Sequence, residues 1–554
     1  MAGPTELVFV PLGGVGEIGM NFGLYGYGPA NNRRWIVVDC GVSFPGPDLP
    51  GIDIVFPEVT FIEEQRDRLL GIVITHAHED HYGALTTLWP KLRAQIYATA
   101  FTAGLLEAKR GNGGTELPVT EVRAGQRIQL GPFEVEFISV AHSIPEAMAL
   151  AIRTEAGTVV HTGDWKIDKD PQVGPPTNEN RLREIGEEGV LALVCDSTNA
   201  ARTGHSPSEG AVARELTTLV AEARGRVAFT LFASNVARLR SIALAARAAG
   251  REVVAVGRAI RRVVEVATEL GYLRDAPPFR EADTLEHLPA GNVVLILSGS
   301  QGEPRAALAR VAAGEDRLVR LGPGDVMVFS SRTIPGNERP VIDIQNRLIA
   351  AGVEVITDRD RLVHVSGHPR REELLEMYNW VRPQILVPVH GEAAHLAAQA
   401  ELGRAAGIKS VLRLEDGGIA RLSPDPTVFP SAVPVGRIYR DGTIVGDRDE
   451  LGISERRRMA FAGHVSVFVL LDHRGELEHA PQCILAGVPI RTADGKPMAG
   501  LVNRAVVGAL SSIPRPRRRD PELVMDAVRR SVRAAIADVW DKKPICTVHV
   551  AVIE

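Results

Sequence analysis

Residues 71–82 read Gly-Ile-Val-Ile-Thr-His-Ala-His-Glu-Asp-His-Tyr. The apolar run at residues 71–75 is typical of a buried strand, and we expect a helix over residues 82–92. Between them lie four potential metal ligands, His76, His78, Asp80 and His81. Imidazole and carboxylate groups are the ligands expected for zinc or manganese. Because the chain has only 15 histidines, three of them within six residues indicate a metal site rather than a solvated loop.

Two further strand ends supply candidate ligands. His142 follows a strand-like run at residues 133–140, and Asp164 follows another at residues 158–161. Either residue alone would more often be an ordinary loop residue. Together with the first segment they favour one shared site, because metal ligands must converge from separate strands. On a turn, His76 and His78 can face one way while Asp80 and His81 face another, so one segment can hold two adjacent ions.

Length and composition set the broad class of the protein. The 554 residues, 45% of them hydrophobic and 24% charged, predict a globular protein of about two to four domains. No apolar run approaches the roughly 18 residues that span a bilayer, and the N-terminus does not resemble a signal peptide. The lack of such a run predicts no membrane partner. The four cysteines are far apart, which favours a reducing cytoplasm. The net charge of −5 leaves room for a local basic groove.

The pattern of elements changes along the chain. Short strands separated by turns run to about residue 196, and alternating helices and strands follow, which predicts an inserted parallel sheet. Strands that end in histidine then return at residues 361–395. Prolines near residues 423–434 mark a linker. We therefore predict boundaries at residues 1–207, 208–360 (the insertion), 361–425, 426–460 (the linker) and 461–554.

A glycine motif near the N-terminus imitates a nucleotide site. Gly14, Gly16 and Gly19 form GxGxxG, and Asp39 lies twenty residues after the last glycine. The dinucleotide fingerprint requires a helix after the last glycine. Residues 20–39 are instead rich in glycine and asparagine and end in a strand, so we predict a hairpin and a tight turn beneath the metal site.

At this point the chain resembles a known superfamily. Asp39, the segment with His76 to His81, His142 and Asp164 are similar to the four successive motifs of the metallo-β-lactamase superfamily. The resemblance implies an α/β fold built as an αββα sandwich. Members of that superfamily include β-lactamases, glyoxalase-type thioesterases and nucleases.

The predicted insertion narrows the resemblance to the β-CASP nucleases. Asp196, His368 and His390 are similar to the three extra motifs of that group, which carries a domain inserted in the metallo-β-lactamase fold. A histidine at the third motif accompanies RNA substrates in that group, and valine accompanies DNA, so His390 implies RNA.

Most of residues 7–440 resemble the bacterial ribonuclease J family, and a small α+β C-terminal domain continues the resemblance more weakly. The matching segments are residues 11–21, 232–235, 298–304 and 330–338 with the two histidine motifs. The chain departs from the pattern at Ala237, where we expect a histidine, and this affects RNA-end binding rather than the metal centre.

The resemblance implies a two-metal ribonuclease with Zn²⁺ or Mn²⁺. His76, His78 and His142 would hold one ion, Asp80, His81 and His390 the other, and Asp164 would bridge them. Asp39 would orient a ligand histidine. A hydroxide would attack phosphorus, with Asp196 as general acid and His368 assisting or exchanging roles.

The resemblance also implies substrate contacts and partners. His364 and Ser366 would hold a phosphate, and Ser234 and Asn235 would bind a 5′-monophosphate. These contacts favour 5′-to-3′ exonuclease activity on single-stranded RNA, with endonuclease activity beside it and 5′-phosphate products. Some expectations follow only from the resemblance. They are a structural Ca²⁺ at Asp48 and Asp441, a homodimer or tetramer, membership of an RNA-degradation complex, and roles in mRNA decay and rRNA maturation.

Three alternatives remain open at the level of sequence. A small-molecule hydrolase, of thioesterase or lactamase type, would explain the ligands but not the insertion. A non-catalytic RNA-binding scaffold would have no use for an intact ligand set. A DNA-repair nuclease is disfavoured by His390.

Overall fold

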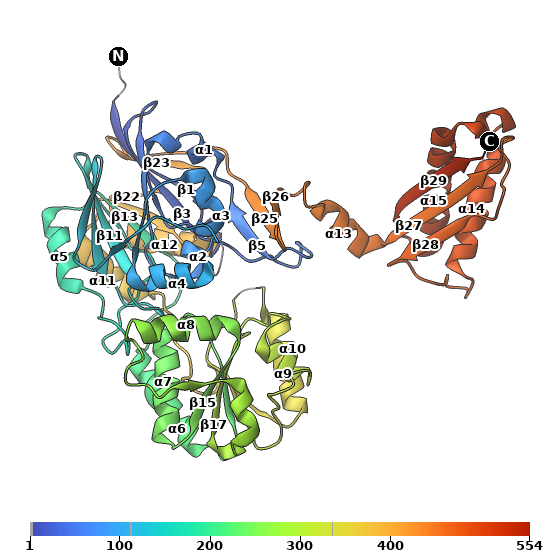
Figure 1. Ribbon diagram of the computed structural model, residues 1–554. Helices are drawn as coiled ribbons and strands as arrows, with labels where there is room; N and C mark the ends of the chain where they lie inside the picture. The colour runs from blue at the N-terminus through green and yellow to red at the C-terminus, as the bar shows by residue number, and fades with distance from the viewer. Residues whose placement is uncertain (1–3, 111–113, 335, 554) are drawn as a thin grey trace. The chain divides into compact units, whose positions relative to one another are not determined.

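The computed structural model of the protein describes residues 4–110, 114–334 and 336–553 (Figure 1). The chain divides into two compact units. One runs to Ser43 and again from Val55 to Arg437, and the other comprises Phe44–Ile54 and the chain from Ile438 onward. Among the described helices, none has the length and apolar character needed to cross a membrane.

The first unit contains a sandwich of two large sheets. The eight-stranded sheet has the order β24 (Thr427–Phe429), β23 (Ile419–Ser423), β1 (Thr5–Gly13), β3 (Phe22–Pro29), β4 (Arg34–Val38), β6 (Leu69–Val73), β7 (Ile96–Thr99) and β8 (Val119–Val122). Strands β3 and β4 pair antiparallel, which confirms the hairpin predicted after the glycine motif and excludes a dinucleotide-binding helix there.

The seven-stranded sheet lies opposite and carries most of the later motifs. Its order is β22 (Ser410–Val411), β20 (Ile385–Val389), β13 (Ala192–Asp196), β12 (Gly157–His161), β11 (Met148–Thr154), β10 (Phe133–Ser139) and β9 (Arg127–Leu130). Buried apolar side chains of both sheets, such as Tyr25 and Phe137, form one core. Helices α5 (Glu179–Glu188), α11 (Arg371–Val381) and α12 (Ala393–Ala405) pack on the outer face of the second sheet.

The inserted region has its own parallel sheet. The strands are β16 (Phe279–Arg280), β15 (Glu252–Val256), β17 (Val293–Leu297), β14 (Val227–Thr230), β18 (Val326–Phe329) and β19 (Glu354–Ile356), and all their pairings are parallel. Helices that include α6 (Glu209–Glu222), α7 (Val236–Ala248), α8 (Arg258–Glu269) and α10 (Glu338–Ala350) alternate with them. The Ser208 side chain caps the N-terminus of α6 by accepting a hydrogen bond from the backbone N–H of Ala211.

Two local predictions need correction. The helix expected over residues 82–92 is broken into α2 (Glu79–Tyr82) and α3 (Leu85–Leu92), because the backbone N–H of Ala84 turns to the carbonyl of Cys40. The region expected to be a linker, 426–460, is largely structured. It contains β24, β25 (Arg437–Asp441), β26 (Ile444–Gly446) and the start of α13 (Ile453–Ala462). The prolines that suggested a linker flank β24, an edge strand, where they are tolerated.

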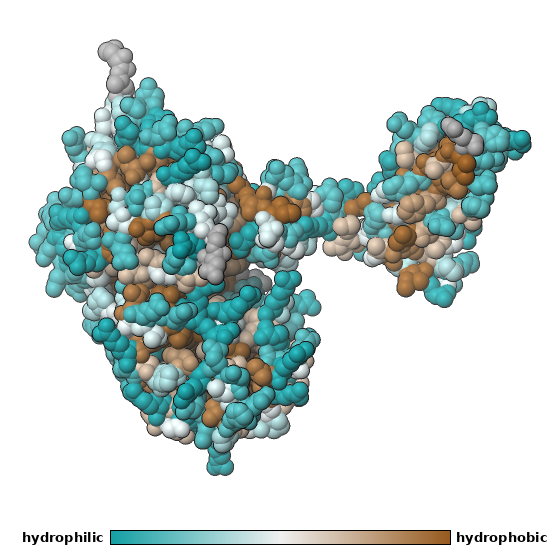
Figure 2. Space-filling model, viewed as in Figure 1, coloured by the Kyte–Doolittle hydropathy of each residue, from teal (hydrophilic) through white to brown (hydrophobic). Residues whose placement is uncertain are grey.

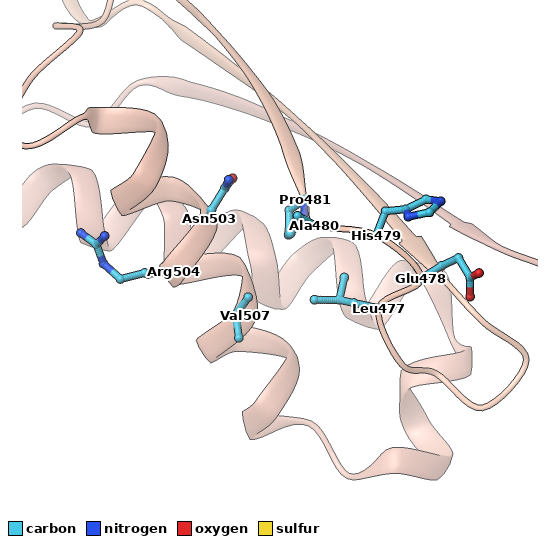
Figure 3. A pocket seen from close by; sticks show the side chains of 8 residues that line it. All are labelled: Leu477, Glu478, His479, Ala480, Pro481, Asn503, Arg504 and Val507. Atoms are coloured by element: carbon cyan, nitrogen blue, oxygen red, sulfur yellow. The ribbon is translucent and has the colours of Figure 1, made fainter.

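The second unit ends in a small α+β domain. Its three-stranded sheet has the order β28 (Gln482–Ala486), β27 (His464–Leu471) and β29 (Ile545–Val552), and its helices are α14 (Met498–Ser512) and α15 (Pro521–Trp540). The helices pack against one face of the sheet, with Val467 and Val528 among the core residues. A pocket of about 460 Å³ beside α14 is lined by Leu477, Asn503, Arg504 and neighbouring residues (Figure 3).

A buried ion pair joins the helices of the inserted region. The guanidinium of Arg238 on α7, which is fully buried, donates three hydrogen bonds to Glu209 and others to Ser330 and the carbonyl of Val363. Replacing Arg238 by Met leaves a buried carboxylate unpaired, so we expect stability to fall by about 3 kcal/mol. In a domain of this size that is a drop of about 6–12 °C in melting temperature.

Arg240 on the same helix provides the matched control. Its partner Asp275 is half exposed, and an exposed ion pair contributes at most about 1 kcal/mol. The Arg240→Met variant should therefore melt close to the unaltered protein in the same scanning calorimetry experiment. Equal losses in the two variants would contradict the role given to the Arg238 pair.

Candidate metal centre

The functional side chains lie where strands end. Strands β10, β12, β13 and β20 run in the same direction in the second sheet. Their ends therefore meet at one edge, and they present His142, Asp164, Asp196 and His390 there. Strand β6 of the first sheet ends close by with the segment that contains His76 and Asp80. The fold thus brings the candidate ligands from separate strands together on one rim.

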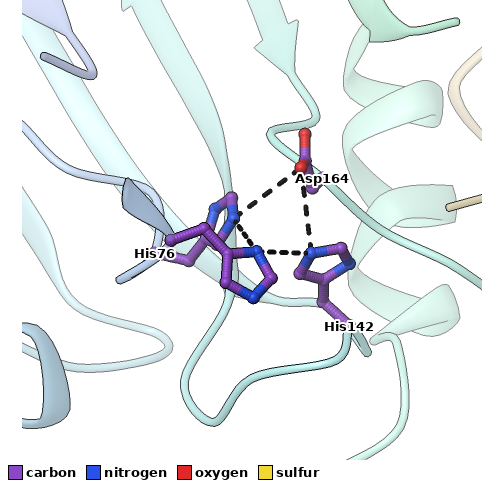
Figure 4. Close-up of side chains that lie close together, drawn as sticks. His76, His142 and Asp164 are labelled. Atoms are coloured by element: carbon purple, nitrogen blue, oxygen red, sulfur yellow. Dashed lines mark hydrogen bonds and ion pairs between the residues drawn. The ribbon is translucent and has the colours of Figure 1, made fainter. Parts of the chain in front are cut away.

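Three imidazoles and a carboxylate form the first ligand group, His76, His78, His142 and Asp164. Nδ1 of His78 lies 3.1 Å from Nε2 of His76 and 3.1 Å from Nε2 of His142. The latter two nitrogens each lie 3.7 Å from Oδ2 of Asp164. Figure 4 shows the rings of His76 and His142 turned toward Asp164.

The second ligand group shares Asp164 with the first and adds Asp80, His81 and His390. Oδ2 of Asp80 lies 3.2 Å from Nε2 of His390 and 3.7 Å from Nε2 of His81. Nε2 of His81 is 3.2 Å from Oδ2 of Asp164. The structure thus brings together all seven residues that the sequence nominated as metal ligands.

The backbone around the centre is strained and closely packed. Asp39 and His390 have φ angles of +65° and +53°, a left-handed conformation that non-glycine residues adopt mainly where the surrounding structure enforces it. A Cβ on Gly41 would come within 1.7 Å of the carbonyl oxygen of Asp80. Glycine at position 41 is therefore what lets the segment after β4 approach the second ligand group.

The donor set fits divalent cations. Burial holds the pKa of His76 and of His142 well below the usual range and lowers the pKa of His78 to about 4, so these rings carry free lone pairs at neutral pH. Oδ1 of Asp164 is sealed from solvent and accepts no hydrogen bond within the described residues. A buried carboxylate oxygen without a partner is costly unless a cation meets it.

The second group is rich in negative charge. Burial alone would lower the pKa of His390, but the carboxylates of Asp164, Asp196 and Asp80 raise it to about 10. The same kind of competition, with Asp164 as the strongest opposing group, raises the pKa of His81. The carboxylates that stabilise a proton on each of these two rings would also stabilise a divalent cation bound in the same place.

Asp196 and His368 form a pair beside both ligand groups. Oδ2 of Asp196 lies 2.7 Å from Nδ1 of His368, and Oδ1 accepts the backbone N–H of Thr198 at 2.8 Å. Asp196 is fully buried, whereas the His368 side chain is 19% exposed. With Asp164 and His390 they make a third possible ligand group, which overlaps the other two.

Family models match four parts of the chain. A beta-lactamase superfamily domain matches residues 34–213, a ribonuclease J beta-CASP domain 224–348, a Zn-dependent metallo-hydrolase RNA specificity domain 352–412, and a ribonuclease J C-terminal domain 451–553. A protein named Ribonuclease J from Sinorhizobium meliloti is 57% identical over 99% of this chain and 98% of its own length. The chain belongs to the ribonuclease J family.

More distant relatives of the same name extend this match. Ribonuclease J of Mycobacterium tuberculosis is 39% identical over 96% of this chain and 95% of its own length. That of Helicobacter pylori is 33% identical over 98% of this chain and 80% of its own length. A solved structure of an Enterococcus faecalis protein of unknown function, 15% identical, covers 75% of this chain and all of its own with a TM-score of 0.51, and shows the fold alone.

Family membership settles the class of enzyme. The chain is a metal-dependent hydrolytic ribonuclease with a metallo-β-lactamase domain, an inserted β-CASP domain and a C-terminal domain. It binds RNA as substrate and divalent metal through its cluster of histidine and aspartate. The small-molecule hydrolase, the inactive scaffold and the DNA-repair nuclease are therefore set aside.

Several residues that support the ribonuclease J centre were not singled out from sequence. Thr75 donates its backbone N–H and its hydroxyl to Asp39, whose Oδ2 lies 2.7 Å from Nδ1 of His81. The carbonyl of Gly367 lies 2.7 Å from Nδ1 of His142. Thr198 contacts Nδ1 of His390 at 2.8 Å. Thr75, Gly367 and Thr198 each lie within two residues of a motif residue in the sequence. This proximity is the sequence signal that could have identified them as supporting residues.

The expected phosphate-binding residues lie on two loops. Ser366 accepts hydrogen bonds from the Asn199 amide and the backbone N–H of His368. His364 has a buried Nδ1 without a partner among the described residues, and burial with Arg238 and Arg332 nearby lowers its pKa. Ser234 and Asn235 lie at the start of α7, where the Asn235 side chain caps the helix by accepting from Arg238.

The expected calcium ligands are not brought into a cluster of acids. Asp441 pairs with Arg456, and Asp48 is exposed. Within the described ranges, neither belongs to a group of three or more acidic, histidine or cysteine ligands. Calcium at these residues stays a prediction from the sequence.

Asp39 should control metal affinity although it is in neither ligand group. Replacing it by asparagine removes the carboxylate that orients His81, so we expect the dissociation constant for Zn²⁺ to rise about 10- to 100-fold. Metal-binding titration with a chromophoric competitor measures this change. The melting temperature in chelator should differ little between the two proteins. A variant that binds metal as tightly as the original would contradict the orienting role.

Proposed function

We propose that this enzyme degrades single-stranded RNA from the 5′ end toward the 3′ end, with additional endonucleolytic cuts, and leaves 5′-phosphate products. The observation that carries the proposal is the pair of ligand groups that share Asp164, with the Asp196–His368 pair beside them. This arrangement supplies two cation sites and a proton carrier on one rim. Two-metal hydrolysis of a phosphodiester uses both kinds of group.

The two ligand groups would hold two divalent ions, Zn²⁺ or Mn²⁺. His76, His78 and His142 are assigned to one, Asp80, His81 and His390 to the other, and Asp164 to both. Such a pair supplies a water that is activated at neutral pH and offsets the charge that develops on the phosphate oxygens. The residues themselves contribute fixed geometry, since they are held by Asp39, Thr198 and the carbonyl of Gly367.

His368, rather than Asp196, is the better candidate for the proton donor to the leaving 3′ oxygen. Both oxygens of Asp196 are engaged, one by His368 and one by the backbone of Thr198, and its side chain is fully buried. The ring of His368 is more exposed, and its Nε2 makes no hydrogen bond in the described part of the chain. Asp196 would therefore orient the imidazole while His368 transfers the proton, a division of labour familiar from His–Asp pairs.

Ser366 and His364 are assigned to a phosphate of the RNA. The Ser366 oxygen already accepts hydrogen bonds, which leaves its O–H available to donate to a phosphate oxygen. His364 lies on the same loop, and the arginines near it provide positive charge.

Ser234 and Asn235 are assigned to the 5′-monophosphate. They stand at the N-terminus of the 13-residue helix α7, where free backbone N–H groups and the helix dipole favour an anion. The Asn235 carbonyl oxygen is used for capping, so its amide N–H₂ and the Ser234 hydroxyl remain as donors. Ala237, in place of the histidine seen in the pattern, leaves this end pocket with one polar group fewer.

The test compares RNA ends. Single-stranded RNA labelled at its 3′ end should shorten progressively in Mn²⁺ when it carries a 5′-monophosphate, and more slowly with a 5′-hydroxyl. A Ser234→Ala variant should lose most of this difference. DNA of the same sequence should stay intact. If the RNA with a 5′-monophosphate and the RNA with a 5′-hydroxyl were cut equally fast, and only into internal fragments, the assignment of Ser234 and Asn235 to the 5′ end would be contradicted. The assignment of the hydrolytic centre would still hold.

The remaining assignments rest on the family. We place the enzyme in the cytoplasm, as a homodimer or tetramer and in an RNA-degradation complex, with roles in mRNA decay and rRNA maturation. The C-terminal domain is the candidate for self-association.

A further inference from the structure

The sheet of the C-terminal domain has one face without a cover. Alternate residues of its strands point into the core formed with α14 and α15. The other alternate residues, which start at His464, Gln482 and Ile545, form what we call the open face. Within the described part of this unit no helix packs on it, and Phe468 and Ile484 there are 42% and 62% exposed. Figure 2 shows apolar surface on this domain among polar residues.

A stacked ring pair lies at the centre of the open face. Phe468 of β27 and His549 of β29 are direct partners in the parallel register. Their ring centroids are 5.1 Å apart and the ring planes differ by 14°. Because the two rings face each other, a nucleic-acid base can stack on the outer face of either exposed ring, since every base has a π-face.

The rest of the open face suits bases better than charged groups. It carries no Asp or Glu, although the domain has several. The hydroxyls of Ser466 and Thr547 and the amide of Gln482 can exchange hydrogen bonds with base edges. His464 contacts the Thr547 hydroxyl at 3.0 Å, which fixes both side chains beside the ring pair.

The charge of the domain complements a polyanion. Residues 464–553 contain 13 Lys and Arg against 9 Asp and Glu, whereas the whole chain contains 63 against 68. Basic residues stand at both ends of the sheet. Lys543 precedes β29, and Arg474 lies in the turn after β27. The segment Arg515–Arg519 contacts that turn at Gly475, and Glu476 neutralises only Arg515 and Arg518 of it.

We propose that the open face binds single-stranded RNA by stacking bases on Phe468 and His549, at a site separate from the metal centre. A sheet of this size can hold about two or three bases, with the basic residues at its ends receiving the flanking phosphates. The site rests on RNA being the substrate. A second copy of the chain could also cover the open face. RNA is favoured because the open face has neutral hydrogen-bonding groups and no carboxylates, which would repel phosphates.

The experiment measures RNA affinity of the full chain in chelator, where no phosphodiester is cut. Fluorescence anisotropy with a labelled single-stranded 20-nucleotide RNA should show an affinity about 5- to 100-fold weaker for Phe468→Ala, in line with the loss of one stacked base. Phe468→Trp, which keeps an aromatic ring at this position, should bind the RNA about as tightly as the original chain does. Val507→Ala, a similarly exposed apolar residue on α14, is the matched control and should bind as the original does.

Two companion measurements separate the outcomes. Light scattering should give the same molecular mass for Phe468→Ala and the original chain, and both should cut a five-nucleotide RNA at the same rate in Mn²⁺. Unchanged RNA affinity in Phe468→Ala would overturn the proposal. Weaker binding together with a smaller mass would also overturn it, and would assign the face to self-association. Failure of the original chain to cut the short RNA would count against the proposed 5′-end activity instead.

Discussion

Replacing Asp164 by asparagine should lower the rate of RNA cleavage about 1000-fold, equivalent to about 4 kcal/mol of transition-state stabilisation. One oxygen of this carboxylate lies within 3.2–3.8 Å of nitrogens of His76, His81, His142 and His368. The other lies 3.7 Å from His390. Loss of its charge therefore weakens both cation sites at once. Steady-state cleavage of 3′-labelled RNA and metal analysis by mass spectrometry would measure the two effects.

Asp170 offers the matched control for this substitution. It lies on the same loop but is half exposed, with Arg214 as its ionic partner. Asp170→Asn should keep its metal content and cut RNA within about twofold of the original rate, since exposed ion pairs contribute little. If Asp164→Asn kept two ions and full activity, the assignment of Asp164 to both sites would be wrong.

His368→Ala and Asp196→Asn should each lower kcat by about 100- to 10,000-fold with KM almost unchanged. The first removes the proton donor, and the second releases the imidazole that Asp196 holds at 2.7 Å. Because the two residues act as one unit, the double variant should be no slower than the worse single variant. Single-turnover kinetics at saturating enzyme would measure the chemical step directly.

A modified substrate distinguishes proton donation from other roles of this pair. An RNA with sulfur in place of the bridging 3′ oxygen has a leaving group that needs no proton near neutral pH, since thiols ionise near pH 8.5. His368→Ala should cut it nearly as fast as the original enzyme does. Loss of a metal ion from the variant, with no rescue by sulfur, would instead assign His368 to the third ligand group.

The strands and most of the helices were predictable because their apolar periodicity is local. The alternation of helices and strands after residue 196 correctly indicated an inserted parallel sheet, in which β17 is a buried apolar strand. The break between α2 and α3 was not predictable, since it depends on a hydrogen bond from Ala84 to Cys40, which lies over forty residues earlier. Strand β24 was hidden in a proline-rich segment because its pairing with β23 comes from the fold.

For the metal centre too, some features could be predicted from the sequence and others could not. The convergence of the candidate ligands could be predicted because four of them lie within six residues and the others follow separate strands. The supporting contacts of Thr75, Thr198 and Gly367 could not, since these residue types are common in loops and their partners lie on distant segments. The sequence left open whether Asp196 or His368 donates the proton, and the proposed choice of His368 depends on burial and on hydrogen bonds that the sequence does not reveal.

The candidate ligands of the metal centre extend along the chain from His76 to His390. The β-CASP domain is synthesised after Asp196 and before His368. During synthesis the first ligand group can assemble when Asp164 has left the ribosome, whereas the second waits for His390. Since domains fold from the N-terminus as they emerge, an unfinished chain lacks part of its nuclease centre. The messenger that encodes this enzyme is thereby not exposed to a complete active site on the nascent chain until translation has passed the codon for His390.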